Sequence, residues 1–171
     1  MSADLRQVIG HNLDVARRVL FIFELKKTLD ERPRIFQRFG IRESLSSRAE
    51  EIKDASLPLV LVFVASCLEH YLKEKIPIEE REKLEKEGNL KFKKLIDHFR
   101  SSIGEKLAKD AHEMRIKRNT ILHKAGVIDG QALKEFKEIG LTGYSIGAKL
   151  ALSEDEVRGY IDVCEKICNL T

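Results

Sequence analysis

The chain has 171 residues, of which 43% are apolar, 35% charged and 6% aromatic. This composition fits one soluble globular domain over residues 1–171 and leaves no room for a second. Ten glycines and three prolines are too few for the many turns of a sandwich or barrel, so an all-α fold is expected. The formal charge of +3 excludes recognition of nucleic acid by bulk charge, and any basic site has to be local.

Three helical segments are predicted in the first half of the chain. Apolar residues recur at steps of three and four over residues 4–28, the spacing of a helix buried along one face. Residues 30–33 and Gly40 break this pattern, and the polar run 44–56 is expected to be a separate, solvated helix. A core helix of about 20 residues then begins at Leu57, with Pro58 in its first turn, where a missing N–H costs little. Its apolar stretch of about 12 residues is shorter than the roughly 18 that a membrane span requires, so no membrane is expected.

The second half predicts shorter elements around one long helix. Residues 79–88 carry mixed charge and indicate a surface segment. An amphipathic helix from 92 to 100 precedes a long helix at 102–125, which Gly126 terminates. The irregular stretch 126–152 contains a short helix at 132–139 and an extended part at 144–152. Ser153 and Glu156 form a capping box for the last helix. The expected architecture is a bundle of four to six main helices with a short irregular segment before the last one.

The cysteines favour a reducing compartment. Cys67, Cys164 and Cys168 show no paired spacing, and the N-terminus lacks the pattern of a signal peptide, so a cytoplasmic location is expected. Cys164 and Cys168 lie one helical turn apart on an apolar stripe, which predicts core packing rather than zinc binding. No metal or other cofactor is expected. His98 follows Asp97 and His112 precedes Glu113, but neighbours in a helix point apart, so neither is expected to form an acid–base pair.

One charged residue interrupts the apolar stripe of the long helix 102–125. The spacing from Met114 to Ile121 calls for an apolar residue near position 118, where the sequence has Arg118. A guanidinium on an apolar stripe is costly unless it meets an anion or a cleft. Asn119 and His123 follow, four residues apart and on one side of the helix.

The run from Arg118 to His123, RNTILH, resembles the hallmark of the HEPN family: an arginine, a polar residue, three to five variable residues and a histidine. That family is a helical bundle with many metal-independent endoribonucleases. Its layout matches the order expected here: a long first helix, a central apolar helix, the motif on a late helix and a capped last helix. A pattern this short occurs about once by chance in such a chain. Arg6 and His11 repeat the spacing, but Gly10 interrupts that pair, and the family does not place its motif on the first helix.

The resemblance implies a role for each residue of the motif. His123 is the general base or acid, Arg118 clamps the phosphate and Asn119 is an orienting hydrogen-bond partner, with a 2′,3′-cyclic phosphate as product. Glu69, the expected counter-ion of Arg118, and His70 could add to the site. Three cations near the motif could bind RNA phosphates: Arg115, Lys117 and Lys124. A second basic cluster, more distant in sequence, consists of Lys91, Lys93 and Lys94.

Helix geometry bears on how the motif could work. Five steps of about 100° place His123 roughly 140° around the helix from Arg118. Either the arginine side chain bends toward the helix end, or a homodimer completes the site across a two-fold axis, as the resemblance implies. The chain is therefore predicted to be a dimeric, cytoplasmic endoribonuclease that acts on RNA as a toxin or in anti-phage defence. The resemblance also implies an antitoxin partner, such as a small nucleotidyltransferase.

Two other functions stay open: a non-catalytic HEPN-like module that binds RNA, a nucleotide or a protein, and a purely structural helical protein. Convergence of Arg118 and His123 in an open cleft would favour catalysis, and burial of either would favour a binding module. An Arg118–Glu69 ion pair with His123 directed to solvent would favour a structural role. The role of segment 126–152, in dimerisation or in the choice of substrate, is not indicated by the sequence.

Overall fold

The computed structural model describes residues 2–30 and 44–171, and within these ranges it contains seven helices and no strand. The all-α prediction is confirmed, and five of the seven described helices are longer than nine residues, within the four to six main helices expected. They are α1 (Ser2–Asp30), α3 (Ser44–Lys75), α4 (Ile78–Lys86), α5 (Phe92–Ile103), α6 (Glu105–Lys124), α7 (Gly130–Glu138) and α8 (Glu154–Leu170). α1 continues through Asp30, and the rest of the predicted break, with Gly40, lies outside the described residues.

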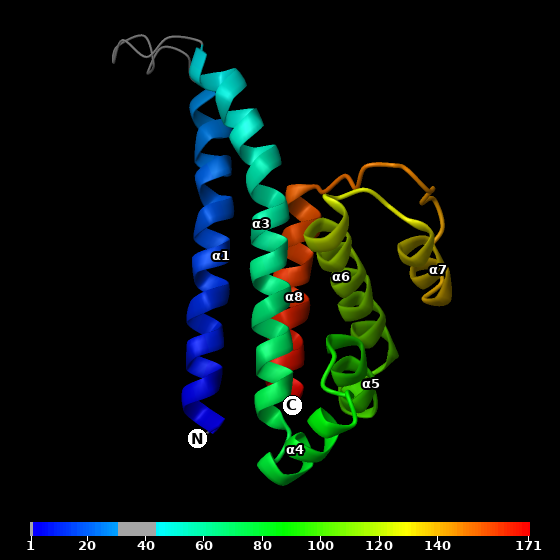
Figure 1. The fold of residues 1–171 in the computed structure, drawn as a ribbon. Helices are drawn as coiled ribbons and strands as arrows, with labels where there is room; N and C mark the ends of the chain where they lie inside the picture. The colour runs from blue at the N-terminus through cyan, green and yellow to red at the C-terminus, as the bar shows by residue number, and fades with distance from the viewer. Residues whose placement is uncertain (1, 31–43) are drawn as a thin grey trace.

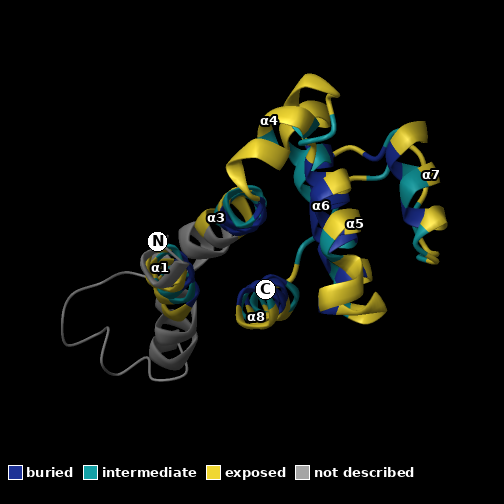
Figure 2. Ribbon diagram, turned by 90° about the horizontal axis from the view of Figure 1, so that it is seen from below, coloured by how far each residue is buried: buried dark blue, intermediate teal, exposed yellow. Residues whose placement is uncertain are grey.

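Helix α3 is the centre of the molecule. It packs against α1 on one side, α6 on the other and α8 between them (Figures 1 and 2). Its residues Leu61, Val64 and Leu68 are completely buried. The part Asp54–Lys75 is long and apolar enough to cross a membrane by length and composition, with a mean hydropathy of 1.6, but half of that stretch is buried inside the protein. The apolar stretch is therefore longer than predicted, and its position is that of the predicted core helix.

The start of α3 differs from the prediction. The helix runs without interruption from Ser44 to Lys75, so Pro58 lies in its interior and not in a first turn. A proline inside a helix removes one backbone hydrogen bond and bends the axis. Figure 1 shows the N-terminal part of α3 leaning toward α1 above this region. α3 packs against α1, and tertiary packing of this kind stabilises a continuous helix. The position of the proline in the sequence does not reveal that contact.

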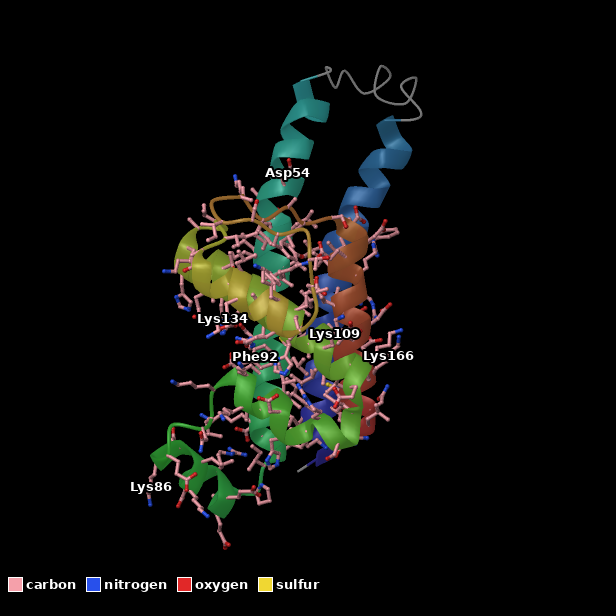
Figure 3. The ribbon with its side chains drawn as sticks, turned by 90° about the vertical axis from the view of Figure 1, so that its right-hand side faces the viewer. Asp54, Lys86, Phe92, Lys109, Lys134 and Lys166 are labelled. Carbon is pink, nitrogen blue, oxygen red and sulfur yellow. The ribbon has the colours of Figure 1, made fainter. Side chains whose placement is uncertain are left out.

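Segment 126–152 forms a small second core on the outer side of α6. Phe136 of α7 stacks on Tyr144, with ring centroids 3.9 Å apart, and both pack with Ile116 of α6 and Ile128. The helix expected at 132–139 is present as α7, but residues 144–152 are mostly irregular, with one isolated bridge from Lys149 to Val127. Figure 3 looks onto the outer side of α7, where Lys134 lies, and Figure 2 shows α7 outermost, beside α6.

The last helix confirms two predictions. The capping box is formed, because the Glu156 N–H donates to Ser153 Oγ at 3.1 Å and the Ser153 N–H donates to Glu156 Oε2 at 3.4 Å. Cys164 and Cys168 are buried on the core face of α8, and Cys67 of α3 is buried as well. All three thiols are free. The charged segment after Pro77 is the surface helix α4, in which no residue is buried.

Candidate functional site

The predicted site residues lie in the last two turns of α6. The helix ends at Lys124, Ala125 takes the left-handed conformation (φ 49°, ψ 34°), and the Gly126 N–H donates to the Thr120 carbonyl at 3.0 Å. This backbone hydrogen bond closes the C-terminal end of the helix through the left-handed residue Ala125. Gly126 was the expected stop, but the first left-handed residue is Ala125. His123 is therefore held in the final turn of a capped helix, where the helix dipole favours a positive charge.

Arg118 is directed toward α3. Its Nη2 lies 2.9 Å from Glu69 Oε2, and its Nη1 donates to Asn119 Oδ1 at 3.2 Å. The arginine side chain is 19% exposed, and its Nε is buried with no hydrogen-bond partner among the described residues. Glu69 is thus the counter-ion that the sequence predicted. The guanidinium is held in place by one carboxylate and one amide and still reaches solvent.

Asn119 and His123 are directed toward α7. Both line a cavity of about 210 Å³ between the end of α6 and the start of α7. His123 is exposed, and Arg118 is not part of this cavity. Within one chain, Asn119 both lines the cavity with His123 and accepts from Arg118, whose guanidinium otherwise faces Glu69 of α3. Arg118 and His123 therefore do not converge, in keeping with their separation of roughly 140° around the helix. The single chain therefore has the Arg118–Glu69 ion pair and the exposed His123 that would be expected of a structural helical protein.

The three cations nearest the motif occupy different environments. Arg115 is buried, and its Nη2 lies 2.7 Å from Glu135 Oε2 of α7. Lys117 is buried between Glu113, at 2.7 Å, and Glu156 of α8. Neither charge reaches solvent, so within a single chain Arg115 and Lys117 are not available to bind RNA phosphates as predicted. Lys124 is 52% exposed, and its Nζ lies 3.2 Å from Asp129 Oδ2.

Lys117 remains charged despite its burial. Desolvation lowers the pKa of its ammonium group, but Tyr160 and the hydrogen bonds to Glu113 and Glu156 outweigh that effect, so the pKa is raised above the ordinary value for lysine. Burial raises the pKa of the Tyr160 phenol in turn. This cluster joins α6 to α8 next to the motif, and it is a structural contact that the sequence pattern did not indicate.

The histidines outside the motif have no shared site in the described part of the chain. His70 is exposed on α3, next to Glu69. His98 lies 4.0 Å from Glu80 of α4. His112 is buried, with its Nε2 3.1 Å from Asp97 Oδ1 of α5. This second pair joins two helices and could not be inferred from residues adjacent in sequence. Burial lowers the pKa of His112, against the opposing effect of Asp97.

The remaining basic residues lie away from the motif. Lys91, Lys93 and Lys94 are exposed at the start of α5, and Lys93 Nζ lies 3.5 Å from Glu138 of α7. Arg6 and His11, which repeat the motif spacing, are exposed on α1. Among the described residues, no group of three or more His, Cys, Asp or Glu side chains could hold a metal ion.

Two residues beside His123 were not identified from the sequence. Asp129 caps α7, because its Oδ1 accepts the Ala132 N–H at 2.8 Å, and Gln131 of the same turn donates to Glu135 at 2.8 Å. Both line the cavity next to His123. The Asp-Gly sequence at 129–130 marks a helix start, but only the packing of α7 on α6 shows that this start faces the motif. The chain matches no family model, and comparison with curated proteins and with solved structures found no similar protein.

Proposed function

We propose that the protein is a metal-independent endoribonuclease of the HEPN type that acts as a two-fold dimer in a toxin or defence system, where an antitoxin would restrain it. The observation that carries this proposal is the arrangement on α6. A partly exposed arginine with a fixed guanidinium, an amide and an exposed imidazole lie within two helical turns, next to a cavity. These are the groups that cleavage of RNA without a metal requires.

The chemistry assigned to these groups is a transfer within the RNA. The 2′-oxygen attacks the adjacent phosphorus, the bond from phosphorus to the 5′-oxygen breaks, and a 2′,3′-cyclic phosphate and a 5′-hydroxyl form. One imidazole takes the proton of the 2′-hydroxyl, and a proton donor, such as His123 of the second copy, protonates the leaving oxygen. Arg118 stabilises the charge that develops on the phosphate, because its planar guanidinium has donors beyond those that contact Glu69 and Asn119.

A second copy of the chain has a suitable surface to bind. Leu59, which is 69% exposed, and Phe63 lie four residues apart on α3, and Leu122 is exposed one turn after Arg118 on α6. We take these three exposed side chains as the contact surface of the proposed dimer. A two-fold axis at this surface would bring both copies of Arg118 and both motif helices to one cleft. The dimer would thereby supply the convergence that is missing from one chain.

The non-catalytic alternative also has an observation in its favour. Arg118 is already neutralised by Glu69, and within one chain it is not directed toward His123. A module that only binds RNA or a protein needs no convergence of these two groups. The two functions differ in one measurable property, which is the breaking of a phosphodiester bond.

The experiment is cleavage of end-labelled RNA by purified protein in EDTA, with mass spectrometry of the new ends. We expect 2′,3′-cyclic phosphate ends, and a loss of about 10²–10⁴-fold in rate for His123→Ala or Arg118→Ala. The matched controls are His11→Ala and Arg6→Ala, which change the same residue types at the same spacing on α1 and should leave the rate unchanged. Absence of cleavage, together with equal growth of cells that express the parent and His123→Ala, would exclude the proposed activity.

A further inference from the structure

The cavity beside His123 differs from the rest of the motif surface in its chemistry. Its inner wall is apolar and is formed by Ile116 of α6 and Ala132 of α7, both of which are buried. Its outer edge is formed by exposed His123 and Gln131, so the cavity is open to solvent on the side of the proposed catalytic group. A ligand that entered here would contact hydrophobic side chains along its faces and polar groups along its edge.

The polar side chains of the cavity include two carboxylates, Asp129 and Glu135, one ammonium group, Lys124, and four side chains that can both donate and accept hydrogen bonds. The Asp129 carboxylate has one oxygen on the Ala132 N–H and the other near Lys124, and the Glu135 carboxylate contacts Arg115 and Gln131. Each oxygen keeps a further lone pair that can accept a hydrogen bond. Lys124 neutralises Asp129 and Arg115 neutralises Glu135, so the cavity carries little net charge to attract a phosphate. An exocyclic amine has two N–H donors that the two carboxylates can accept, whereas uracil offers only its single ring N–H. The cavity is therefore suited to the base of a nucleotide and not to its phosphate.

The size of the cavity supports the same conclusion. At about 210 Å³ it is smaller than the pockets of about 300–1,000 Å³ that hold drug-sized molecules, so it fits one planar ring system rather than a whole nucleotide. Proteins read single-stranded RNA by taking up unstacked bases and bonding to their edges. A carboxylate that accepts from an exocyclic amine is a recognised means of base selection.

We propose that this cavity binds the nucleobase next to the cleaved linkage and selects a base with an exocyclic amine, adenine, cytosine or guanine, over uracil. The inference rests on the proposed endoribonuclease function and adds a substrate preference to it. Asn119 and His123 belong to both the cavity and the motif, so a base held against Ile116 and Ala132 places its own ribose and phosphate beside the imidazole. α7 is then the element that reads the substrate, and α6 carries the catalytic groups.

Binding is tested without cleavage by titrating the parent protein with 2′-deoxy dinucleotides, which lack the attacking hydroxyl. The probes are d(ApA), d(CpC), d(GpG) and d(UpU). Binding of each is monitored by the shifts of the Gln131 and Ala132 amide signals in ¹H–¹⁵N spectra. We expect shifts with the first three and at least fivefold weaker binding of d(UpU). Ala132→Leu fills the cavity and should abolish the shifts, whereas Ala151→Leu, at an exposed position, should not. Gln131→Ala changes only an exposed side chain and should reduce binding in a folded protein, even if Ala132→Leu fails to fold.

Cleavage mapping then separates this inference from the proposed function. An enzyme that cuts RNA beside A, C and G faster than beside U, and loses that preference in Asp129→Asn, which keeps an N-cap for α7 but removes a carboxylate, supports both. An enzyme that cuts all four equally, or dinucleotides that bind equally or not at all, would overturn the base site while the endoribonuclease function stands. Base-selective dinucleotide binding by a protein that cuts no RNA would exclude the proposed function and leave a base-binding cavity.

Discussion

Lys117 shows how a side chain expected at the surface can be part of the interior. Its ammonium group is held between Glu113 and Glu156 and stacks over the rings of Tyr144 and Tyr160. Lys117→Met would leave two carboxylates, both mostly buried, without their cation, so we expect the free energy of unfolding to fall by about 3 kcal/mol. Urea denaturation measures this loss. Lys166→Met, which changes an exposed lysine of α8, is the control and should change stability by less than about 0.5 kcal/mol; equal effects of the two would contradict a buried ion cluster.

His112 should make stability depend on pH in the acidic range. Burial lowers the pKa of His112, and the positive charges of Arg115 and Arg100 lower it further, whereas Asp97 raises it. The net effect is a lowered pKa, so the folded protein favours the neutral imidazole. Because the folded-state pKa lies below the unfolded-state pKa of about 6.5, folding is favoured at pH values above about 6.5. As the pH falls below about 6.5, the unfolded chain takes up the proton more readily and this stability is lost. We therefore expect the unfolding free energy to fall less between pH 7 and pH 5 in His112→Gln than in the parent. His11→Gln, at an exposed site on α1, should keep the parent slope, and identical slopes for all three would contradict the prediction.

The residues of the motif and their neighbours could be predicted to different degrees. Glu69 was identified as the partner of Arg118 because a guanidinium on an apolar stripe requires an anion on the adjacent core helix. The partners of Arg115 and Lys117 could not be identified in this way. Glu135 and Glu156 lie 20 and 39 residues further along the chain, on helices whose packing on α6 has no signature in spacing. Charged residues are mostly exposed unless they are paired, so sequence analysis predicts an exposed side chain wherever the partner is not known.

At the scale of single elements, the end of α6 carries backbone strain. Ala125 has φ 49°, where a side chain costs about 1 kcal/mol or more relative to glycine. Ala125→Gly should raise the free energy of unfolding by about 1 kcal/mol, since the gain in the folded state exceeds the entropy that glycine adds to the unfolded chain. Thermal and urea unfolding measure the change. Ala55→Gly, in the helical interior of α3, is the matched control and should lower stability by about 1 kcal/mol; a loss at both positions would show that the left-handed conformation is not maintained.

The helices were predicted well where the spacing of apolar residues is regular. They were predicted less well where contacts between distant segments determine the backbone conformation. The periodicity of α1, α6 and α8 and the capping box of α8 follow from local sequence. The continuity of α3 through Pro58 involves its packing against α1. Residues 144–152 are held by Tyr144 stacking on Phe136 and by backbone hydrogen bonds to residues 126–128, which form one isolated bridge and no strand. Both outcomes depend on contacts between distant segments.

At the scale of the whole molecule, α3 is central but keeps Leu59 and Phe63 exposed, four residues apart on one face. Phe63→Asp places a charge on that face, so it should weaken the proposed dimer at least tenfold and lower cleavage per chain in parallel. Sedimentation velocity and the RNA assay at the same concentrations measure both. Ile78→Asp makes the same type of change at an exposed position on α4 and should leave both unchanged. A parent protein that cuts RNA while monomeric would contradict the dimeric site.

The burial of the three cysteines has a practical consequence. Desolvation raises the pKa of the Cys67 and Cys164 thiols and raises that of Cys168 to about 12. Alkylating reagents attack the thiolate, so the folded protein should resist them near neutral pH. Rates of alkylation would then report how often the bundle opens. A single cysteine introduced on the outer side of α7, at Lys134, would accept a fluorescent dye without removal of the native thiols.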